Sequence, residues 1–305
     1  MLSYLIRRLL VTVPVLLGIS FVSFALLYLS GDPTDFLLPV NVPEATRQAF
    51  RVAQGFDQPL VVQFVNFLGR ALTGDFGTSL RFQQSAGSLV WERLGATGEL
   101  ALAAMVFAIV VGVPAGAIAA YRFGGFADRA VRSVSLLGQA IPNFYLGVVA
   151  VIVFAVWLRV LPSGGRGTPQ QLLLPALTLG FGLVALIARV TRSCMLDALK
   201  QDYIRTARAK GLSEGLVVWK HALRNAFIPV LTVIGLQFGL LLNGVFVTEI
   251  VFSWPGVGRL AIQSIYSRDF PIVQTIVFLS AVTFVFLNLL VDLLYAVFDP
   301  RISYR

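Results

Sequence analysis

A short polar and basic segment, residues 202–225, interrupts the second half of a mostly apolar chain. It reads DYIRTARAKGLSEGLVVWKHALRN and lies between two apolar runs of membrane-spanning length. Its arginines and lysines can pair with acidic groups, and its small side chains let another surface approach the backbone closely. This chemistry is that of recognition, so the segment is expected to dock onto a partner in the cytosol.

Two short helices joined by a sharp turn are expected in this segment. Asp202 and Tyr203 begin the first helix, and Gly211 can take the positive φ that ends a helix abruptly. Ser213 can cap the second helix. That helix places its apolar side chains on one face, at Leu212, Leu216, Trp219 and Leu223. A basic helix lying on anionic lipid is the simpler alternative, but lipid attraction requires neither the turn nor the small side chains.

Catalytic chemistry has few candidate residues in this chain. His221 is the only histidine and Cys194 the only cysteine, which argues against a histidine-rich metal site, a histidine proton relay or an intrachain disulfide. Asp292 is an acid within an apolar run, and a structural ion pair with Arg301 or Arg189 is favoured over a substrate site. The sequence offers no nucleophile–base pair at one depth and no phosphate-binding G-x-x-x-x-G-K-[ST] loop.

Other polar residues within or beside apolar runs are candidates for a translocation path or gate. Gln237 and Asn243 either line a path or form hydrogen bonds between helices. Glu249 precedes the sequence Ser253-Trp254-Pro255-Gly256. This region is expected to be an outer gate or a binding-protein contact, or else an interfacial anchor with Trp254 in the aromatic belt.

The composition is that of a multi-pass membrane protein. Of 305 residues, 57% are hydrophobic and only 13% charged, against roughly 25% charged in soluble domains. A spanning helix needs about 20 mostly apolar residues. Six runs qualify, and the first is a retained helix because it is longer than a signal-peptide core. The predicted spans are 9–29, 100–120, 134–158, 172–188, 226–248 and 271–298.

Charge asymmetry between the short loops predicts that both termini face the cytosol. The expected outer loops contain only Arg159, Arg166, Arg259 and Arg268. The inner segments contain the larger set: Arg7, Arg8, Arg122, Arg129, Arg132, Arg189, Arg192, Lys200, Arg205, Arg208, Lys210, Lys220, Arg224, Arg301 and Arg305.

A long outer loop after the first span is expected to fold as a cap. It opens at the turn Gly31-Asp32-Pro33 and contains a second turn at 73–77. Helices are expected over 43–54 and 59–72, and Phe64, Phe67 and Leu68 would share a face of the second helix. Within the second predicted span, Gly112 and Gly116 have GxxxG spacing, a weak signal of close helix packing.

The basic segment resembles the EAA loop of ABC importer permeases, with the pattern E-A-A-x-x-x-G, nine residues, then I-x-L-P. Gly211 matches the glycine, Thr206 and Ala207 match the two alanines, and Leu223 matches the leucine. The chain departs from the pattern at Arg205, His221 and Arg224. These departures are typical of the peptide/nickel branch.

Further matches to that branch run through the chain in order: Gly31-Asp32-Pro33, Gly74-Asp75-Phe76-Gly77, Ile141-Pro142, RVTRS at 189–193, TEIVFSWPGVG at 248–258, and NLLVDLLYAVFD at 288–299 followed by Pro300-Arg301. The chain is similar to the first, B-type permease of dipeptide, oligopeptide or nickel importers.

The resemblance implies an all-α polytopic membrane protein with six transmembrane helices. It implies an N-terminal helix in 1–30, an extracytoplasmic cap over 31–95, a type I ABC transmembrane domain over 96–298 and a cytosolic tail at 299–305. Segment 202–225 would contain the coupling helix, which inserts into a cleft of a cytosolic ATPase. The implied coupling residues are Asp202, Tyr203, Arg205, Thr206, Ala207, Arg208, Lys210 and Gly211.

The same resemblance implies the partners and the location. They are a second, C-type permease, two cytosolic ABC ATPase subunits, an extracytoplasmic substrate-binding protein and the lipid of a bacterial inner membrane, with no nucleic acid. This chain would be non-catalytic and bind no cofactor or metal, since its partners use ATP and Mg²⁺. The substrate would be a di- or oligopeptide, or alternatively nickel, glutathione or another small solute, and a homodimeric pore stays open.

Two other classes of membrane protein fit the residues less well. A secondary transporter needs ionisable groups near the middle of the bilayer, and Asp292 is almost the only one. An intramembrane enzyme needs a catalytic group set that the sequence lacks.

Overall fold

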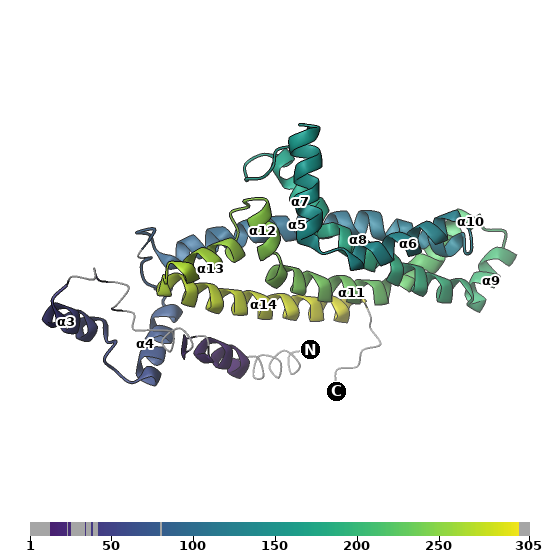
Figure 1. Ribbon diagram of the computed structural model, residues 1–305. Coiled ribbons are helices and arrows are strands. Elements are labelled where there is room, and N and C mark those ends of the chain that lie inside the picture. The colour runs from purple at the N-terminus through teal and green to yellow at the C-terminus, as the bar shows by residue number, and fades with distance from the viewer. Residues whose placement is uncertain are drawn as a thin grey trace. The chain divides into compact units, whose positions relative to one another are not determined.

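The structure is a computed structural model that describes residues 13–22, 24, 25, 34, 38, 42–79 and 81–298, leaving aside the side chains of 54, 242–244, 287, 288 and 290–298. The predicted turn at 31–33, the Asn243 and Asp292 side chains and the tail at 299–305 lie outside this description. Apart from one antiparallel bridge between Thr78 and Ser85, the described residues form helices and their connections (Figure 1). The predicted all-α class is confirmed.

The chain divides into two compact units. Among the described residues, the first unit holds those up to 95 together with 256–286, and the second holds 96–255 with 287–298. The first unit contains α3 (Glu44–Gln54), α4 (Leu60–Leu72), the start of α5 (Ala86–Tyr121), α13 (Val257–Tyr266) and the first part of α14 (Phe270–Phe298). The second contains the rest of α5, α6 (Phe126–Ala140), α7 (Asn143–Ala150), the π-helical turn η1 (Val151–Trp157), α8 (Pro169–Leu199), α9 (Asp202–Ala209), α10 (Glu214–Leu216), the π-helical turn η2 (Val217–Ala222), α11 (Leu223–Gly244) and α12 (Phe246–Val251).

An aromatic cluster organises the first unit. The buried Phe64 and Phe67 lie on one face of α4 with the partly buried Leu68, as the spacing predicted. Phe64 meets Phe24 edge to face at 5.6 Å between ring centroids, and Phe67 meets Phe278 of α14 at 6.1 Å. Such edge-to-face pairs add to the stabilisation that burial of apolar area provides.

The predicted turn at 73–77 also lies in the first unit and holds the chain against the start of α14. Gly74 and Gly77 have φ of 81° and 79°, which glycine adopts without steric cost. Just beyond the turn, the Ser79 hydroxyl donates a 2.5 Å hydrogen bond to the buried Asp269 carboxylate, and the Arg81 amide donates to the same oxygen. The turn therefore orders a polar contact that anchors this part of the unit.

Helices α5, α8 and α11 form the apolar core of the second unit. The chain enters α8 through a capping box. The Gln171 side chain accepts a hydrogen bond from the Thr168 amide, the Thr168 side chain accepts one from the Gln171 amide, and Pro169 takes the first helical position. Glycines on α5 allow α8 to approach closely. A Cβ at Gly116 would lie 2.4 Å from the Ala188 carbonyl oxygen, and one at Gly112 would lie 3.1 Å from Ile187. The GxxxG interpretation of these two glycines agrees with this packing.

The structure corrects the single span predicted over 134–158. Helix α6 ends at Ala140, and α7 with η1 continues after a bend of 99°. Ile141 has extended backbone angles (φ −88°, ψ 123°), and Pro142 precedes the first turn of α7. A residue before proline is disfavoured in the helical region, so the sequence Ile-Pro breaks the apolar run at this point.

Of the six spans predicted from the sequence, parts of 9–29 and most side chains at the end of 271–298 lie outside the described residues, although α14 is one continuous helix over the sixth span. Among the residues that the structure describes, three continuous helical segments are long and apolar enough to cross a membrane, namely Ala86–Tyr121, Pro169–Leu199 and Glu214–Leu241. The bent pair adds a fourth if it counts as one span. Helices α5 and α8 also extend well beyond the predicted ends of their spans, because polar residues continue the helices past the apolar windows.

Candidate functional site

The basic segment folds as a helix, a sharp turn and a second helix at one end of the second unit (Figure 1). Helix α9 contains eight residues, and the continuous helical stretch of α10, η2 and α11 follows the turn. Ser213 stands at the expected N-cap position, but its side chain makes no capping hydrogen bond. The turn, rather than a side-chain cap, therefore defines where the second helix begins.

Gly211 forms the turn through its backbone conformation. Its φ is 73°, and its amide donates to the Arg208 carbonyl at 2.9 Å while the Leu212 amide donates to the Ala207 carbonyl at 3.4 Å. This pair of hydrogen bonds is the Schellman arrangement that ends helices at a left-handed residue. A Cβ at Gly211 would meet no atom within 4 Å, so conformation and not crowding within the chain favours glycine.

An ion pair across the turn fixes the two helices relative to each other. The Arg208 guanidinium donates two hydrogen bonds to Glu214, at 2.8 and 3.2 Å. This hydrogen bonding raises the pKa of Arg208 above its usual value. Arg208 was predicted to pair with acidic side chains of an ATPase, and it already pairs with Glu214 within the chain.

The inner face of α9 packs on the rest of the second unit. Ile204 and Ala207 are buried in an apolar cluster, to which α5, α8, η2 and α11 also contribute: Ala117, Ala120, Met195, Ala198, Val217, Val218, Ala222 and Ala226. The small side chains in this cluster let α9 lie close to the neighbouring helices. A displacement of α9 would therefore push directly on the ends of α5 and α8.

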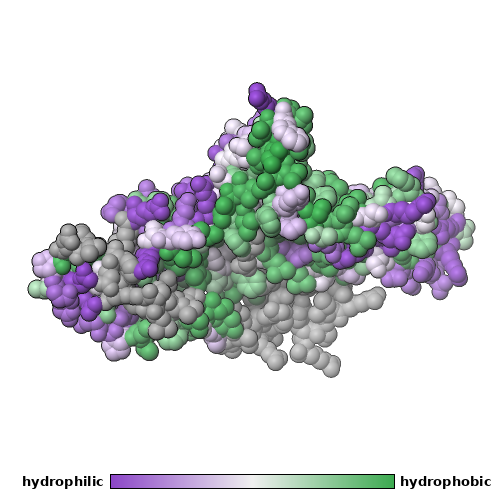
Figure 2. Space-filling view, in the orientation of Figure 1, coloured by the Kyte–Doolittle hydropathy of each residue, from purple (hydrophilic) through white to green (hydrophobic). Residues whose placement is uncertain are grey.

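The outer face of α9 is open to solvent and basic. We call the exposed residues of this face and its turn the α9 surface: Asp202, Tyr203, Arg205, Thr206, Arg208, Lys210 and Gly211. Arg205 lies 3.7 Å from Asp202, but both side chains are more than 80% exposed, so this pair contributes little to stability. Figure 2 shows hydrophilic surface at the α9 and α10 end of this unit and apolar surface around α7 and α8. Ala207, which the sequence placed in the coupling set, is buried beneath this surface.

The apolar face predicted for the second helix packs only at Leu223, which is partly buried against the core. Val217, Val218 and Ala222 are buried, whereas Leu216 and Trp219 are exposed. The π-helical turn η2 begins at Val217, and its Val217, Val218 and Ala222 side chains form the packed face there. The exposed side faces a cavity of about 500 Å³, lined by Trp219, Leu223, Arg224, Asn225, Phe227, Ile228 and Leu231.

The candidate gate residue Glu249 lies inside the second unit. Its side chain is fully buried and accepts a 2.6 Å hydrogen bond from the Thr97 hydroxyl. Trp254 is fully buried as well, and its indole N–H donates to the Ala96 carbonyl at 2.9 Å. Trp254 is therefore packed in the protein and does not stand in an aromatic belt. Gln237 is half-buried on α11.

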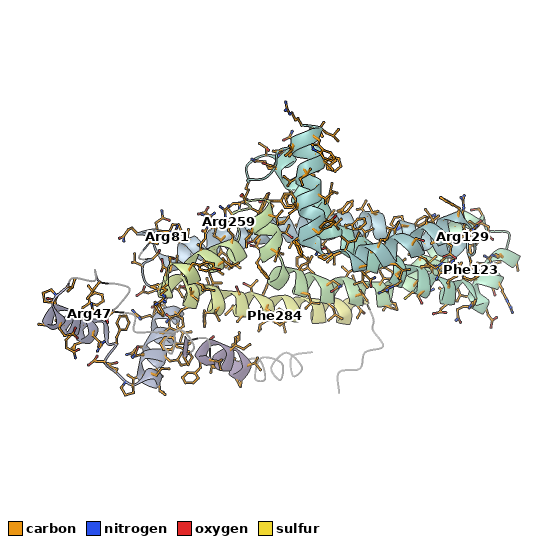
Figure 3. All side chains as sticks on the ribbon, in the orientation of Figure 1. Arg47, Arg81, Phe123, Arg129, Arg259 and Phe284 are labelled. Atoms are coloured by element: carbon orange, nitrogen blue, oxygen red, sulfur yellow. The ribbon has the colours of Figure 1, made fainter. Side chains whose placement is uncertain are left out.

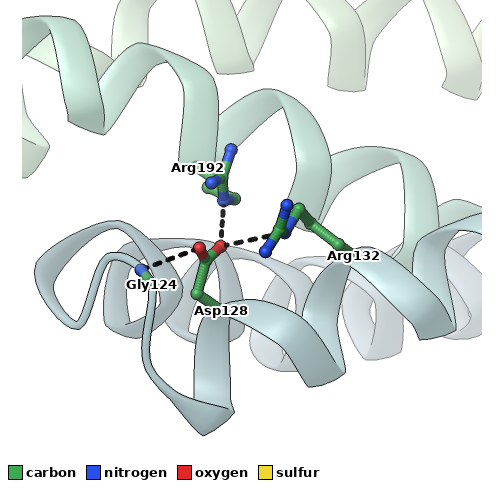
Figure 4. A network of polar contacts seen from close by, with 4 residues as sticks. All are labelled: Gly124, Asp128, Arg132 and Arg192. Carbon is green, nitrogen blue, oxygen red and sulfur yellow. Dashed lines mark hydrogen bonds and ion pairs between the residues drawn. The ribbon is translucent and has the colours of Figure 1, made fainter.

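A buried ion-pair network that the sequence did not reveal joins α6 to α8 (Figure 4). The Asp128 side chain is 1% exposed and accepts hydrogen bonds from Arg192 and, at 3.0 Å, from the Gly124 amide. Arg132 lies 3.6 Å from the same carboxylate, and the Arg192 guanidinium covers the Phe123 ring. The available signal was an acid just after a Gly-Gly turn, but no sequence spacing connects it with the RVTRS motif.

Metal chemistry has no evident site in the described part of the chain, where no group of three or more His, Cys, Asp or Glu side chains could hold an ion. His221 lies on η2, and its carbonyl oxygen accepts a hydrogen bond from Asn225. The geometry is that of an exposed basic helix packed on a helical core.

Comparison with known families matches nearly the whole chain. Residues 112–304 match the family described as binding-protein-dependent transport system inner membrane component. Residues 1–97 match the family described as the N-terminal part of binding-protein-dependent transport system membrane components.

Curated relatives match over their full length. The chain is 40% identical to the dipeptide transport system permease protein DppB of Alkalihalophilus pseudofirmus, with both chains covered completely. It is 42% identical to the glutathione transport system permease protein GsiC of Escherichia coli, again with both chains covered completely.

Solved structures show the fold at lower sequence identity. The MetNI methionine ABC transporter in inward-facing conformations matches with a TM-score of 0.59 at 19% identity, over 69% of this chain and 96% of the other. An amino acid ABC transporter crystallised with histidines matches with a TM-score of 0.53 at 17% identity, over 68% of this chain and 93% of the other. The helical arrangement is therefore that of an ABC transporter transmembrane domain.

Proposed function

The chain belongs to the family of binding-protein-dependent transport system inner membrane components, and we propose that it forms half of the translocation path of an ATP-driven importer for short peptides. The observation that carries the proposal is the α9 surface, an exposed basic helix whose inner face packs on the ends of the spanning helices. A membrane-spanning pore does not need such an element, whereas a pore moved by a cytosolic motor does.

The proposed mechanism passes force from an ATPase through α9 to the spanning helices. The α9 surface sits in a cleft of a cytosolic ABC ATPase, and closure of the ATPase pair on ATP displaces α9. The apolar cluster beneath Ile204 and Ala207 transmits that movement to α5 and α8. The spans then open outward to receive substrate from an extracytoplasmic binding protein, and ATP hydrolysis resets them.

The proposed assembly contains one copy of this chain, a second permease of the C type and two ATPase subunits in a bacterial inner membrane. Both termini face the cytosol, as the basic residues of the α9 surface and of the α5–α6 turn support. This chain performs no catalysis and binds neither ATP nor Mg²⁺, which the ATPase subunits use. Gln237, Asn243 and Glu249 stay candidates for the path, and Glu249 would require a movement that exposes its buried carboxylate.

Glutathione is the second candidate substrate, because a glutathione permease is as similar to this chain as a dipeptide permease is. Both substrates are short peptides in the chemical sense. Their shared features are a free amine, carboxylates and amide groups.

Uptake by the reconstituted assembly tests the function. The permeases, ATPases and binding protein are placed in proteoliposomes, and entry of a labelled dipeptide is measured with ATP and Mg²⁺, with unlabelled glutathione or Ni²⁺ as competitor. We expect ATP-dependent dipeptide uptake that requires the binding protein. Uptake that persists without ATP would contradict an ATP-driven importer, and absence of dipeptide uptake by an assembly that imports Ni²⁺ would replace the peptide with a metal substrate.

A further inference from the structure

A partly open cavity between α6 and α8 combines three arginines with an apolar wall. It has a volume of about 250 Å³ and is lined by Val131, Arg132, Ser135, Leu136, Arg189 and Arg192. One water molecule needs only about 10–15 Å³ on a comparable measure, so the cavity has room for a polyatomic group. All six residues belong to the second unit.

The electrostatics of the cavity favour an anion. Arg132 and Arg192 share the single carboxylate of Asp128. Arg189 is exposed and forms no ion pair with any residue that the structure describes. Three arginines therefore line the cavity beside a single acid, which leaves its surroundings positive. Guanidinium groups bind phosphate oxygens through paired hydrogen bonds.

A buried hydroxyl points to the same kind of ligand independently. Ser135 is 2% exposed, and its Oγ has no hydrogen-bond partner in the described structure. A buried polar group without a partner is costly, and such groups usually receive a hydrogen bond from a water or a ligand. A phosphate oxygen in the cavity would satisfy this hydroxyl.

The apolar wall selects among phosphate compounds. Val131 and Leu136 form the wall, and Leu136 is 69% exposed, beside the exposed Leu137 on the same helix. A free phosphate ion gains nothing from these side chains, whereas a lipid acyl chain buries them. Basic pockets between spanning helices on the cytosolic side are known to hold anionic lipid headgroups.

We propose that this cavity binds one anionic phospholipid of the cytosolic leaflet, with its phosphate at Arg189 and Ser135 and one acyl chain along Leu136. The placement in the cytosolic leaflet rests on the proposed orientation of the chain. The lipid neutralises the excess charge beside the Asp128 network and thereby stabilises the junction of α6 with α8.

Lipid binding to the purified full assembly tests the proposal without ATP or transport. The binding of phosphatidylglycerol and phosphatidylcholine is titrated by native mass spectrometry, for the wild type and for Arg189→Gln. A basic residue near anionic lipid typically accounts for about a fivefold change in binding. We expect phosphatidylglycerol to bind more tightly than phosphatidylcholine and Arg189→Gln to weaken it about fivefold. Ser135→Ala should also weaken phosphatidylglycerol binding, because it removes the hydroxyl that is proposed to bind the phosphate.

A matched variant provides the control. Arg129, labelled in Figure 3, is exposed on α6, the helix that carries Ser135, and it does not line the cavity. Its replacement by glutamine removes the same charge as Arg189→Gln. Arg129→Gln should leave binding unchanged. An equal loss in Arg129→Gln and Arg189→Gln would overturn the proposal, as would equal binding of the two lipids or no lipid bound to the full assembly. Complete displacement by inorganic phosphate would assign a free-anion site instead. Because the measurement needs no uptake, its failure is separate from a failure of the transport function.

Discussion

Gly211 is the residue at which backbone geometry and proposed function meet most closely. Its positive φ is required by the Schellman turn, while the space around its Cα is open within the chain. The structure thus separates two reasons for glycine. A side chain at Gly211 should cost a small amount of folding free energy through backbone conformation. It should impair transport strongly only if a partner surface covers the turn.

Replacing Gly211 tests this separation. Gly211→Asn should keep the turn, because asparagine tolerates the left-handed region, whereas Gly211→Ala should cost about 1 kcal/mol. Gly211→Trp should leave the protein in the membrane but abolish coupled transport. Uptake and ATPase activity of the reconstituted assembly are the measurements.

Gly215 provides the matched control for the bulky substitution. It lies four residues further on, also has open space around it, and does not have a positive φ. Gly215→Trp should retain more transport than Gly211→Trp. Wild-type transport in Gly211→Trp would be incompatible with docking at the turn.

Asp128 makes a second prediction at the residue scale. Asp128→Asn leaves the largely buried Arg192 without its carboxylate, and breaking a buried pair typically costs about 3 kcal/mol. The apparent melting temperature of the purified assembly should fall clearly. Asp197→Asn is the control, because Asp197 is an exposed acid on α8. If Asp128→Asn and Asp197→Asn have the same apparent melting temperature, the network does not hold α6 to α8.

At the scale of elements, the α5–α8 contact positions the docking helix. Both helices end in the apolar cluster beneath α9, and Gly116 brings α5 against the backbone of α8. Tight packing of this kind makes the two helices move together, since packed interiors transmit displacement. The contact is therefore the element-scale link between α9 and the spans.

A single methyl group at Gly116 should disturb that link. Its Cβ would lie 2.4 Å from the Ala188 carbonyl oxygen, so Gly116→Ala must separate the helices, at a cost of about 1–3 kcal/mol. Gly98→Ala is the matched control on the same helix, where a Cβ meets nothing within 4 Å. Gly98→Ala should be neutral or stabilise by up to about 1 kcal/mol through helix propensity. The melting temperature should therefore fall for Gly116→Ala and stay the same or rise for Gly98→Ala, and an equal fall in both variants would contradict the packing described.

The element scale also shows how far periodicity predicts structure. The faces of α4 and the turn at Gly211 follow from local spacing and backbone preference, which the sequence carries directly. The packed face of the second helix did not, because Val217, Val218 and Ala222 of η2 are buried while Leu216 and Trp219 are exposed, a choice set by tertiary contacts rather than by local spacing. The bend at Pro142 was readable from the Ile-Pro pair, but the length of the apolar run favoured one span.

At the scale of the whole molecule, distant residues meet in contacts that sequence spacing cannot reveal. The carboxylate of Asp128 meets Arg192 across 64 positions, and Thr97 meets Glu249 across 152. The sequence identified Arg192 and Glu249 as notable residues, but only the fold supplies their partners. The family, by contrast, was accessible from ordered motifs, and the comparisons confirmed it.

The chain as a whole is proposed to be one part of a machine whose motor lies outside it. Its described residues place a basic helix at one end of a helical unit and a core of three long helices behind it. The claim on which every functional statement rests is that the α9 surface contacts an ATPase subunit.

Site-specific cross-linking tests that claim directly. A photoreactive benzoylphenylalanine replaces the exposed Thr206 of α9, or the 65% exposed Val110 of α5 as control, in the assembled transporter. Our account predicts that position 206 captures the ATPase subunit, with a yield that changes when ATP and Mg²⁺ are added, and that position 110 does not. Absence of the ATPase product from position 206 in an assembly that still imports peptide, or equal capture from both positions, would contradict it.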